Sequence, residues 1–106
     1  MYLEIGKNPI LFKMKNKQNI FDNKNPYTIG IEEEYMICNP DSKNLMDRAN
    51  QIFDYLSEDD LKRFSYELLL SEIEVNTPIC NSANEATKSI AILRSKLLEI
   101  GKKLGF

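Results

Sequence analysis

The sequence contains no histidine and no tryptophan, and only two cysteines among its 106 residues. Without histidine, no imidazole within this segment can act as a general base or bind a metal ion. Cys38 and Cys80 stand far apart and in no CxxC arrangement, so the pattern favours reduced thiols over a disulfide bond, which is the alternative. No apolar run approaches the roughly 20 residues of a membrane span, and no apolar core of a signal peptide precedes a cleavage site. We therefore expect a cytoplasmic protein with no membrane partner.

The composition is that of one small globular domain. Apolar residues make up 42% of the chain and charged residues 28%, with a net charge of −2. A chain with this charge has no basic field for nucleic acid, so we expect no such partner. Residues 1–26 hold five lysines and several asparagines without sustained periodicity, and we interpret them as an N-terminal extension. The acidic residues concentrate in 27–106, which we interpret as the folded domain.

Alternating side chains predict β-strands in two regions of residues 27–106. Residues 64–79 form one strand, or two strands with a kink near Ser71. Residues 27–38 form a strand with one apolar face, interrupted only by Glu33. The apolar residues on that face are Tyr27, Ile29, Ile31, Tyr35 and Ile37.

Two further regions have helical patterns. Residues 48–56 carry apolar side chains at helical spacing, and Asp47 is the expected N-cap. Ser82 and Glu85 form the sequence pattern of a capping box, which begins a long amphipathic helix that we expect to end at Gly105. The order strand, helix, strand, helix predicts an α+β fold.

The most informative feature is a pair of carboxylate runs on the predicted strands. Strand side chains alternate between faces, so Glu32 and Glu34 point the same way, as do Glu72 and Glu74. Two charges about 7 Å apart repel by about 2 kcal/mol at an effective dielectric constant of 20. If the strands pair, the four acids crowd one face, where a divalent cation would neutralise them. The simpler alternative is a solvated acidic face.

Two other glutamates are predicted to have structural or surface roles. Glu33 falls among apolar residues, so we expect it at an edge or paired with a lysine or arginine, and not in catalysis. Glu67 falls on the face opposite Glu74 if residues 64–79 form one regular strand, which predicts an ordinary surface charge.

Several of these features together resemble the start of the type 2 glutamate–cysteine ligases, also called carboxylate–amine ligases. They are Tyr-Thr-Ile-Gly-Ile-Glu-Glu-Glu-Tyr-Met at 27–36, Asn39-Pro40, Glu-Val-Asn-Thr-Pro-Ile-Cys at 74–80, and the long capped helix. The resemblance implies an antiparallel-type sheet with helices packed on one face, as part of a catalytic domain like those of glutamine synthetase and guanidino kinases. Family members are several times longer, so residues 27–106 would be the N-terminal part of that domain and inactive alone.

The resemblance also implies a reaction and a set of site residues. The ligases use ATP to activate the γ-carboxylate of glutamate as an acyl phosphate, which the amine of cysteine or a similar amino acid converts to an amide, as in glutathione biosynthesis. Mg²⁺ or Mn²⁺ would be held by Glu32, Glu34 and Glu74, while Gly30 and Thr77 would lie against substrate or ATP. No side chain is assigned a covalent catalytic role. The alternative function is a non-catalytic metal-binding or self-associating α+β module, including a homo-oligomer.

Overall fold

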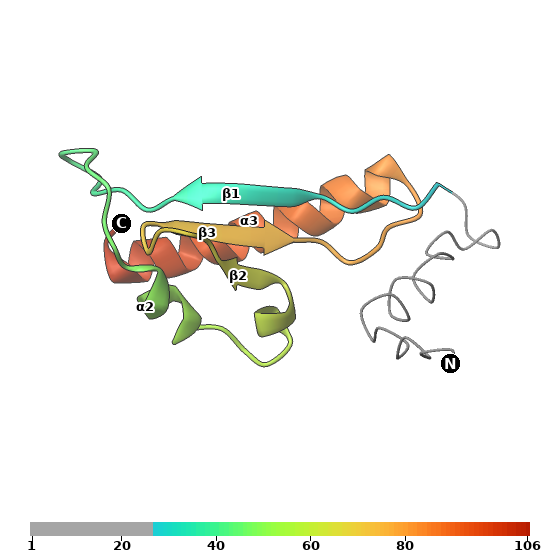
Figure 1. Cartoon of the computed structure of the whole chain (residues 1–106). Coiled ribbons are helices and arrows are strands. Elements are labelled where there is room, and N and C mark those ends of the chain that lie inside the picture. Colours follow the sequence, from blue (N-terminus) through green and yellow to red (C-terminus); the bar gives the residue numbers. More distant parts are fainter. Residues whose placement is uncertain (1–26) are drawn as a thin grey trace, which may run out of the picture.

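The computed structural model describes residues 27–106, so the predicted extension at 1–26 lies outside the described residues. The predicted α+β fold is confirmed: a three-stranded antiparallel sheet in the order β1-β3-β2 is combined with helices (Figure 1). The elements are β1 (Glu32–Met36), α2 (Ala49–Phe53), the 3-10 helix η1 (Asp60–Lys62), β2 (Phe64–Tyr66), β3 (Glu72–Asn76) and α3 (Ala83–Leu104).

The helices pack on one face of this sheet, as expected. Helix α3 runs behind β1 and β3 in Figure 1. Alternation along β3 turns Ile73 and Val75 toward the helices and the glutamates of β3 away from them. Both apolar side chains are fully buried in a core shared with residues of α2, β2 and α3. The core side chains are Ile37, Ala49, Ile52, Phe64, Ile73, Val75, Ile90, Leu93 and Ile100.

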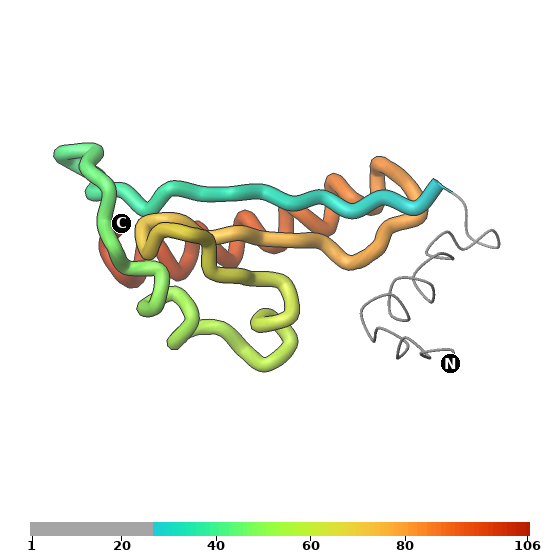
Figure 2. Tube along the Cα trace, in the orientation of Figure 1, coloured from blue at the N-terminus to red at the C-terminus, as the bar shows by residue number. Residues whose placement is uncertain are grey.

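The predicted strand at 27–38 is shorter in the structure, although the chain stays extended around it. Isolated bridges join Ile29 to Cys80 and Cys38 to Leu45 on either side of β1. Figure 2 shows this extended chain running beside the segment that contains β3. Of the two alternatives for residues 64–79, the structure has two strands, with the chain reversing between β2 and β3.

The predicted cap of the first helix is wrong. Arg48, and not Asp47, occupies the N-cap of α2, and no side chain accepts a capping hydrogen bond there. The Arg48 side chain donates to Gln51 Oε1 at 2.8 Å and to the Leu104 carbonyl at 3.1 Å. The Ala49 N–H donates to the Leu70 carbonyl at 2.9 Å. Contacts with distant segments therefore determine where α2 begins, in place of a local cap.

The predicted ends of the long helix are confirmed. Ser82 Oγ accepts a hydrogen bond from the Glu85 N–H at 3.1 Å, while the Glu85 carboxylate accepts one from the Asn81 N–H at 2.8 Å. Gly105 ends α3 at φ 79°, the left-handed conformation that glycine adopts without strain. Within the described part of the chain, α3 and the other helices are too short or too polar to cross a membrane.

Candidate metal-binding site

Strand pairing brings two of the predicted metal ligands together. Glu34 lies directly opposite Glu74 across β1 and β3, and Glu32 lies opposite Asn76. The ladder hydrogen bonds involve the alternate positions, such as Ile37 N–H to the Ser71 carbonyl at 2.7 Å. Glu34 and Glu74 therefore form a non-hydrogen-bonded pair, the type in which Cα atoms lie only about 4.5 Å apart.

A third carboxylate joins this pair. Glu34, Glu67 and Glu74 each offer an oxygen within 4.8 Å of the others; we call these residues the carboxylate cluster. The prediction that Glu67 lies on the face opposite Glu74 is therefore wrong. Ser65 of β2 pairs with Glu74 of β3, so Ser65 and Glu67 share the face of Glu74 once the chain reverses. The two-strand alternative for residues 64–79 included a kink near Ser71 but not the reversal that produces this placement.

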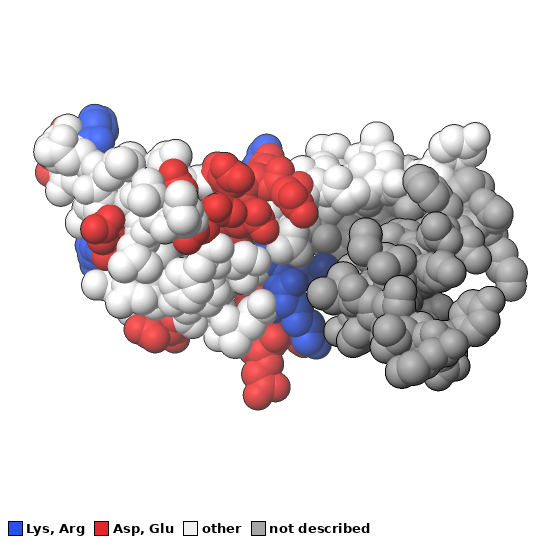
Figure 3. Space-filling model, in the orientation of Figure 1, with Lys and Arg blue, Asp and Glu red and all other residues white. Residues whose placement is uncertain are grey.

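The carboxylate cluster carries negative charge that no cationic side chain of residues 27–106 neutralises through an ion pair. None of the ion pairs formed within residues 27–106 includes a cluster member. The pKa of Glu74 is raised above its usual value, first by a carboxyl–carboxyl hydrogen bond with Glu67, then by desolvation and by the charges of Glu32 and the rest of the cluster. Acidic side chains gather over β1 and β3 on the face away from α3 (Figure 3).

The other predicted site residues surround a small pocket beside the cluster. Gly30, Glu32 and Thr77 line it together with Ile31 and Asn76, and its volume is about 260 Å³. A Cβ atom on Gly30 would meet no other atom within 4 Å, so the absence of a side chain leaves open space. The Thr77 hydroxyl accepts a hydrogen bond from the Ile31 N–H at 3.0 Å, and its own proton is available to donate. Glu32 is therefore part of the pocket wall and not of the carboxylate cluster.

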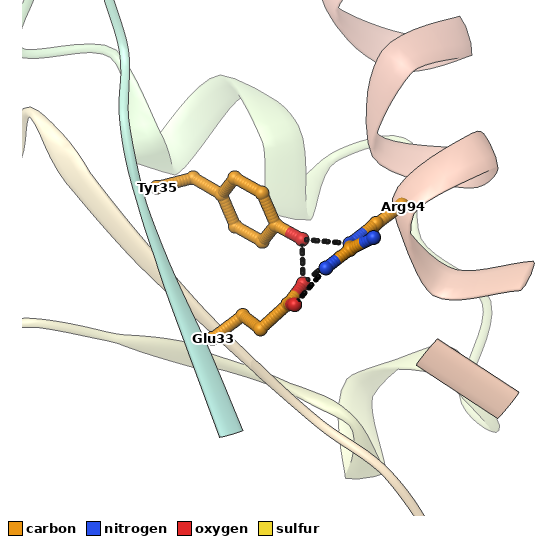
Figure 4. Close-up of polar contacts among 3 residues, drawn as sticks. All are labelled: Glu33, Tyr35 and Arg94. Atoms are coloured by element: carbon orange, nitrogen blue, oxygen red, sulfur yellow. Dashed lines mark hydrogen bonds and ion pairs between the residues drawn. The ribbon is translucent and has the colours of Figure 1, made fainter. Parts of the chain in front are cut away.

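The prediction that Glu33 pairs with a cationic side chain is confirmed. Glu33 points from β1 toward α3, where its carboxylate accepts hydrogen bonds from the Tyr35 hydroxyl and from Arg94 Nη2 and Nε, the last at 2.7 Å (Figure 4). These bonds, that of Arg94 above all, lower the pKa of Glu33. Glu33 therefore anchors α3 to the edge of the sheet and faces away from the carboxylate cluster.

The donor set of the carboxylate cluster fits a hard divalent cation. Mg²⁺ prefers oxygen ligands and usually keeps several water molecules beside one or two carboxylates. Glu34 and Glu74 project from adjacent strands, whose ladder fixes their backbone positions, while Glu67 follows β2 directly. A cation bound there would also offset the charges of the neighbouring glutamates, which add to the effect of the Glu67 hydrogen bond and of desolvation in raising the pKa of Glu74.

These observations define a small α+β domain whose sheet carries, on the face away from its helices, carboxylates with no ion-pair partner in the described part of the chain. Its sequence matches proteins whose names are "putative glutamate–cysteine ligase 2" or "2-1". The relative from Rubrobacter xylanophilus is 33% identical over 89 residues, which cover 84% of this chain and 22% of the relative. Relatives from Herpetosiphon aurantiacus and Roseiflexus sp. are 34% and 32% identical over 80 residues, 76% of this chain and 21% of each relative.

The matches confirm the resemblance to the type 2 glutamate–cysteine ligases, to which this chain is related over most of its length. The chain spans about a fifth of the length of these relatives. No family model matches it, and no solved structure does.

Proposed function

We propose that this chain supplies the metal-binding acidic face of an ATP-dependent carboxylate–amine ligase of the glutamate–cysteine ligase type. The observation that carries the proposal is the carboxylate cluster, which is unneutralised by any ion pair within residues 27–106. The relatives' names support the choice of a ligase, and glutamate with cysteine as its substrates. A place in glutathione biosynthesis and a cytoplasmic location follow from the same proposal.

The cluster residues would hold the ion in two different ways. Glu34 and Glu74 are fixed by the β1–β3 ladder and offer oxygens from paired strands, whereas Glu67 approaches from the end of β2. Bound Mg²⁺ or Mn²⁺ would neutralise the charge of the ATP phosphates and of the acyl phosphate. Glu74 must be deprotonated to bind the ion, and its raised pKa makes it the cluster member most sensitive to acid.

The pocket beside the cluster is the proposed contact with substrate or ATP. Gly30 leaves room for close approach, and the Thr77 hydroxyl can donate a hydrogen bond while it accepts one from Ile31. Glu32 lines the same pocket and is the proposed third family ligand, acting beside the cluster. Glu67 takes its place within the cluster itself.

A chimeric enzyme tests the proposed function. Residues 27–106 replace the matching segment of the Rubrobacter relative, and ADP release that depends on glutamate and cysteine is measured with Mg²⁺. We expect an active chimera that loses most of its activity on Glu34→Gln or Glu74→Gln substitution. Glu99→Gln, the same chemical change at an exposed position of α3, is the matched control and should leave the activity unchanged. An active chimera that is indifferent to Glu34→Gln and Glu74→Gln would contradict the proposal.

One observation favours the second candidate function, a self-associating module. The turn between β2 and β3 exposes Leu68, Leu69 and Leu70 to 92%, 50% and 52%. Adjacent exposed leucines are typical of a surface that binds another protein. A Leu68→Ser variant separates the two functions. Association through this turn, measured by sedimentation, should be weaker in the variant than in the wild type. Cation binding, measured by titration calorimetry, should be the same in both.

A further inference from the structure

A pocket of about 410 Å³ lies between β1 and α3, on the helix side of the sheet and so on the face opposite the carboxylate cluster. Its floor is formed by Ile37, Ile52 and Ile73, core side chains that are at most 4% exposed. Leu97 and Leu98 of α3 form one wall. A pocket of this volume, with apolar walls and few polar groups, is typical of sites that bind small apolar molecules.

One end of this pocket is formed by Phe106, which the end of α3 holds in place. The Phe106 N–H donates a hydrogen bond to the Gly101 carbonyl at 3.0 Å, after Gly105 turns the chain in its left-handed conformation. A Cβ atom at position 101 would lie 2.9 Å from the Phe106 carbonyl oxygen, so the absence of a side chain there leaves room for the turn. The Arg48 guanidinium lies over the Phe106 ring, 4.8 Å from its centroid. Phe106 is therefore a fixed wall of the pocket.

The two ends of the pocket differ in charge. Arg94 lines one end, where Glu33 balances its charge in an ion pair. Lys102 lines the end where Phe106 lies, and neither Lys102 nor Arg48 forms an ion pair within residues 27–106. Eight helical positions separate Arg94 from Lys102, which is about 12 Å along the axis. The pocket therefore offers an apolar channel that is neutral at one end and positive at the other.

We propose that this pocket binds a linear monocarboxylate. The apolar chain of the ligand lies along Leu97 and Leu98 toward Arg94, and its carboxylate pairs with Lys102 at the Phe106 end. The apolar lining selects the chain, because burial of each CH₂ group favours binding. The positive charge at one end selects an anionic head group and disfavours a cationic one.

A phosphate head group is a poorer match to this pocket. Phosphate is best recognised by the planar fork of an arginine, which binds two of its oxygens at once. Arg94 is the one arginine that lines the pocket, and its guanidinium already binds Glu33. Lys102 offers a compact single charge, which suits one carboxylate.

Titration calorimetry of the full chain with a series of probes tests the proposal. We expect octanoate to bind more tightly than octanol, and octanol more tightly than octylamine, because only the carboxylate is attracted by Lys102. Heptanoate should bind about fourfold more weakly than octanoate, since it buries one CH₂ group fewer. The affinities should be the same in Glu34→Gln, because the carboxylate cluster lies on the other face of the sheet. A failure of the proposed ligase function would therefore leave this test intact.

Matched variants of α3 identify the two parts of the site. Lys102→Gln should weaken octanoate binding by up to about fivefold and leave octanol binding unchanged, with Lys103→Gln, outside the pocket lining, as the control. Leu98→Gln should weaken the binding of both probes. Ile92→Gln, a change at a similarly exposed position of α3 outside the pocket, should weaken neither.

Cys38 reports where the ligand binds. It lines the pocket and is half-buried, whereas Cys80, the other cysteine of the sequence, is 1% exposed. N-ethylmaleimide should therefore react at Cys38, and saturating octanoate should slow this reaction several-fold. Alkylation at the same rate with and without octanoate would overturn the proposal, as would octylamine that binds as tightly as octanoate. An octanoate affinity that falls as the protein concentration rises, together with a dimer in sedimentation, would also overturn it, because a second copy would then fill the pocket.

Discussion

Glu34 of β1 lies directly opposite Glu74 of β3, and Glu67 completes a group of carboxylates within 4.8 Å of one another. Like charges in directly opposed positions of a sheet destabilise the fold. The pKa of Glu74 is raised first by its hydrogen bond with Glu67 and by desolvation, and the charges of the neighbouring glutamates raise it further. This arrangement therefore lowers the stability of the domain at neutral pH, a cost that the cation of the proposed site would offset.

Removal of one charge from the carboxylate cluster should stabilise the metal-free chain. We expect Glu67→Gln to raise the melting temperature measured without divalent cations, because the repulsion on Glu74 falls. The same variant should lose much of the rise in melting temperature that Mn²⁺ gives the wild type. Glu99→Gln on α3 serves as the control and should change neither quantity. A Glu67→Gln variant with a lowered melting temperature and an unchanged response to Mn²⁺ would contradict this prediction.

Strand alternation made part of the site predictable from the sequence. It placed Glu32 with Glu34 on one face, and it set Glu33 apart as a residue in need of a cationic partner. It did not reveal Glu67, because the face of this residue depends on whether the chain runs straight or reverses before β3. It also did not reveal Arg94 as the partner of Glu33, since 61 residues separate them and only the packing of α3 brings them together.

The start of α2 was unpredictable for a similar reason. Asp47 has the chemistry of an N-cap, but the structure begins the helix one residue later, where Arg48 contacts Gln51 and the end of α3. The capping residues of α3 were predictable because Ser82, Glu85 and Gly105 act within a turn of their own sequence positions. Local signals thus located the long helix, whereas contacts between distant segments located the short one.

Acid should weaken cation binding at the carboxylate cluster. The pKa of Glu74 is raised, so this carboxyl takes up a proton as the pH falls toward the mildly acidic range, before an ordinary glutamate does. A protonated Glu74 cannot bind the ion. We expect the affinity for Mn²⁺, measured by titration calorimetry, to begin to fall at a higher pH than the pKa of an ordinary glutamate, about 4.3, would give. Glu74→Gln should flatten this dependence, and an equally steep fall in that variant would assign the effect to another group.

The stability of the metal-free chain should change with pH in the opposite direction to its affinity for the cation: protonation of Glu74 should raise the free energy of unfolding. Because the folded-state pKa of Glu74 lies above its unfolded value, the folded state binds this proton more tightly. The resulting contribution to stability is present below the unfolded pKa and is lost as the pH rises through the folded pKa. Denaturation by urea in the presence of a chelator should therefore give a smaller free energy of unfolding at neutral pH than at mildly acidic pH, with the difference reduced in Glu74→Gln.

Asp60 should contribute to acid sensitivity at lower pH. Hydrogen bonds from Lys96 of α3 and from Ser57 lower its pKa to about 2. A lowered folded-state pKa gives stability that is present above the unfolded pKa, near 3.8, and is lost as the pH falls toward 2. We expect Asp60→Asn to cost roughly 1 kcal/mol at neutral pH, since Lys96 is partly exposed and water screens the pair. Asp59→Asn is the control, because the Asp59–Lys62 pair is largely exposed and its loss should change the free energy of unfolding little.

Arg94 should hold α3 against β1 through Glu33. Arg94→Met leaves the Glu33 carboxylate on the helix-facing side of the sheet with only the Tyr35 hydroxyl as a partner, so we expect a lower melting temperature. The lowered pKa of Glu33 should also return toward its ordinary value, because Arg94 is the main cause of the shift. Glu33→Leu in the Arg94→Met background removes the unpaired charge and should recover much of the lost stability. A double-mutant cycle with no coupling between the two positions would show that the pair does not anchor the helix.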